Sequence, residues 1–106
     1  RIHTTSLELV EEVLQKIKAL ADENRLKIIK MLLKKKYCVS ALSGQLNISE
    51  SAVSQQLKIL READLVRGLK EGYYVHYEIK SDELKKIGEY IMELEKLQKN
   101  EECCHD

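Results

Sequence analysis

The chain lacks proline, tryptophan and phenylalanine entirely, and its 106 residues include only four glycines and five tyrosines. A core must therefore be built from Leu, Ile, Val, Ala and Tyr, a composition that suits packed helices. No stretch approaches the roughly 18–20 apolar residues that a membrane span needs. The start of the chain shows no leader with a charged, an apolar and a small-residue region, so we expect a cytoplasmic protein without a membrane partner.

Sequence signatures of common enzymes are also missing. The chain has no Gly-rich phosphate loop, no HExxH and no GxSxG, and its three histidines do not stand near paired carboxylates. We therefore expect neither enzymatic activity nor an organic cofactor.

The formal net charge is zero, but the charges are unevenly distributed. Residues 13–75 carry 12 basic and 6 acidic side chains, whereas residues 76–106 carry 5 basic and 9 acidic ones. Lysines often only keep a surface solvated, yet a basic body between acidic ends is typical of a nucleic-acid-binding surface. The charge pattern thus predicts a nucleic-acid partner, which the helix-turn-helix described below specifies as double-stranded DNA.

Amphipathic helices are predicted at both ends of the chain, over residues 7–20 and 81–99. In each, apolar residues recur at spacings of three and four, as on one face of a helix. The seams consist of Leu7, Val10, Leu14 and Ile17 in the first helix and of Leu84, Ile87, Ile91 and Leu94 in the last. A single domain over residues 1–106 is too small to bury both seams alone, so we expect a homodimer joined by these helices.

The middle of the chain predicts a helix-turn-helix over residues 39–63. Asp22 is a predicted N-cap of an earlier helix, and Ser49 is the predicted N-cap of the second helix of the pair. That second helix has an apolar side formed by Val53, Leu57 and Leu60. The side chains on its opposite face are short and polar, as a helix that enters a major groove requires.

A β-hairpin wing is predicted directly afterwards, over residues 65–79. Its strands are expected at residues 65–69 and 73–79, with Gly72 supplying the positive φ that a tight turn needs. The resulting fold class is mainly α with a β-hairpin wing, in the order ααααββα. The predicted DNA contacts on the second helix and the wing are Ser51, Ser54, Gln55, Gln56, Lys58, Arg61, Arg67 and Lys70.

Three stretches of the chain resemble the ArsR/SmtB family of metal-responsive winged helix-turn-helix repressors. Residues 19–29 are similar to the family's LADPTRLRIL stretch, residues 46–60 to its LxLSQSxVSxHLxxL recognition motif, and residues 63–66 with 71–77 to its wing. The resemblance implies a homodimer that binds a palindromic operator in its ligand-free state, with Ser51, Ser54 and Gln55 facing the bases. Gln55 or Gln56 stands where the family often has His, and Glu50 stands where it often has Gln. The preferred bases are therefore expected to differ.

The resemblance also implies release of DNA when thiolates or imidazoles bind a metal. At one common family site, the start of the helix before the recognition helix, this chain has Cys38 but carries Ser40 where a second cysteine is usual. The other common site needs histidine on the last helix, and residues 81–99 contain none. A standard zinc, cobalt or nickel site of that kind is thereby excluded.

The remaining soft ligands are Cys103, Cys104 and His105 near the end of the sequence. Thiolates select soft ions, and family members with adjacent cysteines near a chain end respond to arsenite. We therefore expect arsenite or antimonite as the inducer, with Zn(II), Cd(II) and Cu(I) left open. Cys38 is a further candidate donor, although a small buried side chain is its expected role.

Two other interpretations of the same sequence remain open. Cys103 and Cys104 could respond to oxidation rather than to metal, which would keep the DNA binding and change the signal. Alternatively, the winged helix could serve only contacts with other proteins. Titration with an oxidant in the absence of metal distinguishes the first, and a gel shift with the chain's own promoter distinguishes the second.

Overall fold

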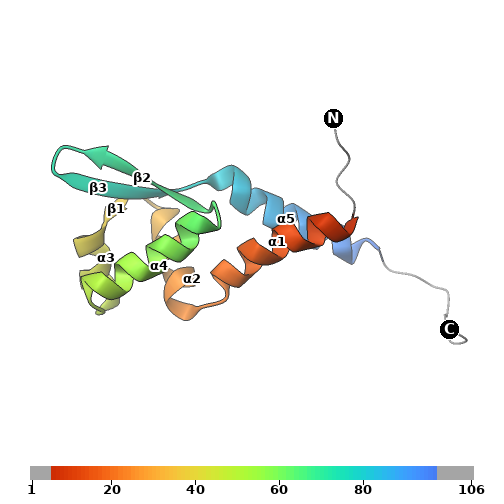
Figure 1. Cartoon of the computed structure of the whole chain (residues 1–106), viewed down its shortest axis with the longest axis horizontal. Helices are drawn as coiled ribbons and strands as arrows, with labels where there is room; N and C mark the ends of the chain where they lie inside the picture. The colour runs from red at the N-terminus through yellow and green to blue at the C-terminus, as the bar shows by residue number, and fades with distance from the viewer. Residues whose placement is uncertain (1–5, 98–106) are drawn as a thin grey trace, which may run out of the picture.

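The computed structural model describes residues 6–97. In this part of the chain five helices and three strands follow one another (Figure 1). They are α1 (Ser6–Leu20), α2 (Glu23–Leu32), β1 (Tyr37–Cys38), α3 (Val39–Leu46), α4 (Glu50–Glu62), β2 (Val66–Glu71), β3 (Tyr74–Ile79) and α5 (Ser81–Glu95). The mainly α fold with a hairpin wing is confirmed. No helix in these residues is long and apolar enough to cross a membrane.

The sheet has one strand more than the sequence predicted. Strand β1 pairs antiparallel with β3 through Tyr37 opposite Tyr77 and Cys38 opposite His76, which gives the order β1-β3-β2. Cys38 was expected to begin the third helix, but that helix starts at Val39. Two residues are too few to show the alternation of a strand, and it is the ladder with the distant β3 that makes this segment extended.

The wing hairpin has a tighter turn than predicted. Its ladder continues from Val66 opposite Ile79 to Glu71 opposite Tyr74. Gly72 has φ +65°, as expected, but Tyr73 lies with it in the turn rather than in the strand and is fully exposed. The two-residue turn therefore brings an aromatic side chain to the tip of the wing.

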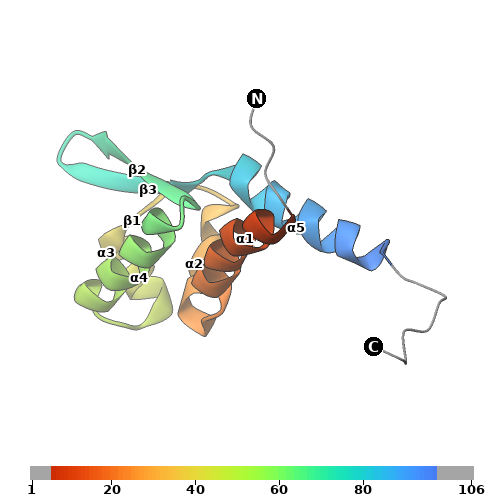
Figure 2. The same ribbon diagram turned by 45° about the vertical axis from the view of Figure 1, so that its right-hand side comes forward.

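The core lies where α2, α3, α4 and the base of the hairpin meet. Its most deeply buried side chains are those of Ile28, Leu42, Val53, Leu57, Leu60, Leu65 and Val66. Helix α2 lies beside α1 and also contacts α4, while α3 packs on α4 (Figure 2). The tip of the hairpin and the outer ends of α1 and α5 point to opposite ends of the molecule (Figure 1).

Polar side chains fix the start of two helices in the way the sequence predicted. The Asp22 carboxylate accepts a hydrogen bond of 3.1 Å from the Arg25 backbone N–H at the start of α2. The Ser49 hydroxyl accepts one of 3.0 Å from the Ala52 backbone N–H at the start of α4. Both bonds satisfy a backbone donor that has no partner within the helix.

Leu57→Ala and Ile59→Ala test the orientation of α4, because the first side chain is buried and the second is 38% exposed. Leu57→Ala is expected to lower the free energy of unfolding by about 2–5 kcal/mol, since it leaves a cavity in the core. Ile59→Ala on the same helix should lower it much less. Urea unfolding followed by circular dichroism measures both, and equal losses would contradict the orientation.

Candidate nucleic-acid interface and sensing residues

The outward side of α4 is a continuous polar surface. The buried positions 53, 57 and 60 leave Ser51, Ser54, Gln55, Lys58 and Arg61 exposed, as predicted. Hydroxyl and carboxamide groups can both donate and accept hydrogen bonds at base edges, whereas lysine and arginine suit phosphates. Their exposure is confirmed, and their contact with DNA stays a prediction.

Gln56 departs from this pattern. Its side chain is half-buried, and its Oε1 accepts a hydrogen bond of 2.8 Å from Nη1 of Arg25 on α2. The sequence placed Gln56 among the DNA contacts, since Gln55 or Gln56 stands where the family often has His. A helix turns by about 100° per residue, so Gln56 instead faces the neighbouring helix.

The wing presents the predicted pair of basic side chains in two different settings. Lys70 is exposed near the tip. Arg67 lies near the base of the hairpin, where its Nε is 2.6 Å from Oε2 of Glu78 on the partner strand. The Glu78 carboxylate offsets part of the Arg67 charge, so Lys70 is the stronger phosphate candidate.

Sequence reasoning missed the exposed aromatic side chains of the wing, Tyr73 and Tyr74. The signal that could have found them is Gly72, because a two-residue turn starting at this glycine places both tyrosines at the tip. An aromatic ring with a hydroxyl group can pack on sugar and donate to phosphate in one contact.

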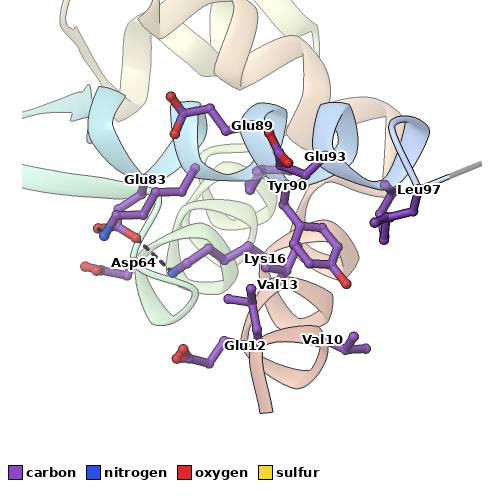
Figure 3. A pocket seen from close by; sticks show the side chains of 14 residues that line it. Val10, Glu12, Val13, Lys16, Asp64, Glu83, Glu89, Tyr90, Glu93 and Leu97 are labelled. Atoms are coloured by element: carbon purple, nitrogen blue, oxygen red, sulfur yellow. Dashed lines mark hydrogen bonds and ion pairs between the residues drawn. The ribbon is translucent and has the colours of Figure 1, made fainter. Parts of the chain in front are cut away.

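Lys16 connects α1 to the C-terminal end of α4. Its ammonium group donates a hydrogen bond of 2.9 Å to the backbone carbonyl of Ala63, the C-cap of α4, and lies 3.4 Å from Oε1 of Glu83 on α5 (Figure 3). The pKa of Glu83 is lowered, mainly by its hydrogen bond with Lys86 and also by Lys16. Lys16 therefore joins three helices at one point.

Helices α1 and α5 leave an apolar groove between them, of about 980 Å³. Val10 and Val13 line it from α1, and Tyr90 and Leu97 from the other side (Figure 3). Four large apolar side chains that line the groove are 41–70% exposed, namely those of Leu9, Val10, Leu94 and Leu97. Leu14 of α1 and Ile91 of α5 do not line the groove but are also exposed, at 41% and 51%. A surface of this kind in a small protein marks an interaction site.

The predicted sensing residues fall in two places. Cys103, Cys104 and His105 lie outside the described residues, and residues 6–97 contain no group of three or more His, Cys, Asp or Glu side chains that could hold a metal. Cys38 is half-exposed rather than buried, because β1 lies at the edge of the sheet. Its Sγ is 3.4 Å from Oγ of Ser40, and this hydrogen bond lowers the pKa of the thiol.

A short helix, a turn and a polar-faced helix, followed by a hairpin, define a winged helix-turn-helix, an architecture of DNA-binding proteins. Residues 22–67 match the model of the family described as bacterial regulatory protein, arsR family. The transcriptional activator HlyU of Vibrio cholerae is 42% identical over 74% of this chain and 72% of that protein. The chain therefore belongs to the ArsR family.

Two further relatives carry the names of repressors. The arsenical resistance operon repressor of Bacillus subtilis is 36% identical over 76% of this chain and 77% of that protein. The transcriptional repressor SmtB homolog of Synechocystis is 38% identical over 70% of this chain, and the alignment spans only 56% of that protein.

Solved structures agree with the fold. HlyU from Vibrio cholerae has a TM-score of 0.70 at 38% identity, over 82% of this chain and 95% of that one. Reduced HlyU from the same organism has a TM-score of 0.71 at 38% identity, over 83% of this chain and 93% of that one. The homodimeric winged helix-turn-helix domain of Mb0332 from Mycobacterium bovis has a TM-score of 0.70, over 99% of this chain and 100% of that one. At 21% identity this likeness shows the fold alone.

Gln55→Ala and Lys58→Ala separate base reading from phosphate contact on the exposed face of α4. Gln55→Ala is expected to weaken the free energy of binding to the operator by about 1–3 kcal/mol and to relax the preference for particular bases. Lys58→Ala should weaken binding to all DNA sequences alike. It should also reduce the slope of the logarithm of the binding constant against the logarithm of the salt concentration by about one for each phosphate that the lysine no longer neutralises. Fluorescence anisotropy on operator and random DNA measures both. Identical behaviour of the two variants would contradict the assigned roles.

Proposed function

We propose that this chain is a dimeric transcriptional repressor that binds operator DNA through α4 and the wing. The observation that carries the proposal is the exposure of Ser51, Ser54 and Gln55 on one face of α4, with Lys58 beside them. The two relatives named as repressors support repression, whereas HlyU is named as an activator. Transcription from the chain's own promoter in vitro, with and without the protein, separates these two activities. A gel shift on that promoter tests the DNA binding itself and the alternative of protein contacts only.

Dimerisation is the second part of the proposal. A second copy of the chain would cover the exposed apolar side chains of α1 and α5, and Mb0332, which shares the fold, is described as homodimeric. Pairing by a two-fold axis would place two copies of α4 on one duplex, in successive turns of the major groove. The operator would then be palindromic.

Release of DNA by a soft metal or metalloid is the third part, with arsenite or antimonite favoured. Its support is chemical: two adjacent thiolates of Cys103 and Cys104, with His105 beside them, suit a soft ion. The name of the Bacillus subtilis relative points in the same direction. Binding of the ion must favour the conformation that does not bind DNA, by about 1.4 kcal/mol for each tenfold loss of operator affinity.

An oxidation-sensitive switch is a second candidate for the signal, and one observation favours it. Cys38 is half-exposed, and its hydrogen bond with Ser40 lowers the pKa of the thiol. A lowered pKa increases the fraction of thiolate, which is the form that oxidants attack. Loss of operator binding on titration with peroxide under chelator would support this signal over metal.

Leu14→Glu combined with Ile91→Glu tests the dimer. Carboxylates buried in the proposed interface would be unpaired and costly, so the variant should be monomeric and lose operator binding. Leu33→Glu is the matched control, because Leu33 is 54% exposed but follows α2 and belongs to neither α1 nor α5. Analytical ultracentrifugation at micromolar concentration measures the result, and a monomeric unaltered chain would refute the proposal.

A Cys103→Ser, Cys104→Ser double variant tests the inducer site. It is expected to bind operator as tightly as the unaltered chain and to remain bound when arsenite is added, because serine is a poor ligand for soft ions. Cys38→Ser is the control and should still respond to arsenite if Cys38 is not a donor. Release of DNA by the double variant at the same arsenite concentration as the unaltered chain would show that the two cysteines do not form the site.

A further inference from the structure

Gln56 occupies a position on α4 where its sequence neighbours and its contacts point to different roles. Ser54 and Gln55 just before it and Lys58 just after it are exposed, whereas Gln56 is half-buried and hydrogen-bonded to Arg25. A side chain whose carboxamide oxygen is already bound within the protein has less capacity to read a base edge.

The Arg25 guanidinium group joins three helices. It belongs to the first turn of α2, and its Nε donates a hydrogen bond of 2.6 Å to the carbonyl of Ala19 in the last turn of α1. Its Nη2 lies 3.5 Å from the carbonyl of Lys18 in the same turn, and its Nη1 donates to Gln56 on α4. The last carbonyls of a helix lack partners within the helix and carry partial negative charge, so they are suitable acceptors for a cation.

The geometry of this group makes it a rigid connection. Guanidinium is planar and presents its donors in a fixed fork, so the bonds to Ala19 and Gln56 together constrain the direction of α4 relative to the end of α1. Lys16 connects α1 to the C-cap of α4 at a second point. Two contacts along the length of α4 restrain its rotation and its tilt, which one contact alone would not.

We infer that Gln56 is a positioning residue for operator binding: through Arg25 it fixes α4 to the last turn of α1 and does not read bases. The inference rests on the proposed DNA-binding function. It restricts the base-reading set on α4 to Ser51, Ser54 and Gln55. It also places a direct connection between the helix proposed to dimerise and the helix proposed to enter the groove.

The first test compares Gln56→Met with Gln56→Glu, and uses the same two changes at Gln55 as the matched control. Methionine keeps the size of Gln56 but removes the acceptor for Arg25, so affinity should fall by about three- to tenfold on operator and on random DNA alike. Glutamate restores an acceptor and should return affinity to within about threefold of the unaltered chain, with the same preferred bases. Both changes at Gln55 should instead alter base preference.

The opposite pattern would overturn the inference. If Gln56→Met changed the preferred base at any operator position, Gln56 would be a reader. The same conclusion would follow if Gln56→Glu lost operator binding to the extent that Gln55→Glu does. Selection of binding sites from operators randomised at one position at a time measures base preference for each variant.

The second test does not involve DNA and so separates this inference from the proposed function. Arg25→Met, Gln56→Met and the double variant form a double-mutant cycle with the unaltered chain. The change in the unfolding equilibrium constant of the double variant should differ by about threefold or more from the product of the two single changes. Additive effects would refute the connection between Arg25 and Gln56. Coupling in a chain that binds no operator would refute the DNA-binding function and leave the connection standing.

Discussion

The apolar stripe of α4 is the constraint on which the rest of this structure depends. Val53, Leu57 and Leu60 are buried almost completely, against α2, α3 and the base of the wing. Removing three such side chains from water stabilises the fold by several kcal/mol in total, at about 1.5–3 kcal/mol each. Because this burial sets which side of the helix faces the core, the polar residues at the intervening positions face outward. The same packing that stabilises the domain therefore determines which side chains of α4 are exposed for the proposed contact with DNA.

Polar contacts then connect this buried helix to the helices proposed to pair. Lys16 bonds to the C-cap carbonyl of α4 and lies beside Glu83 of α5, and Arg25 links the end of α1 to Gln56. These hydrogen bonds, together with the apolar contacts, offer a route by which a change in the packing of α1 against α5 would reach α4. This arrangement is what a repressor would need to convert an event at its paired helices into a different angle between its two recognition helices.

Much of the fold could be predicted because its determinants are local. The period of the apolar residues indicates the inward side of α4, and the caps at Asp22 and Ser49 need only their own helices. The missed features depend on residues distant in sequence: β1 exists through its pairing with β3, and the burial of Gln56 reflects Arg25, 31 residues away. Cys38 was expected to be buried, and only the edge position of β1 explains its exposure. The DNA contacts, the dimer and the inducer remain predictions, because each involves a molecule beyond a single chain.

The central claim is that two copies of this chain read one duplex through α4. Selection from a pool of random double-stranded DNA by the purified protein, followed by sequencing, tests it most directly. The expected result is enrichment of a two-fold symmetric motif whose half-sites are separated by one helical turn, about 10–10.5 base pairs, or a multiple of it. Failure to enrich any motif, or enrichment of a motif without two-fold symmetry, would contradict it.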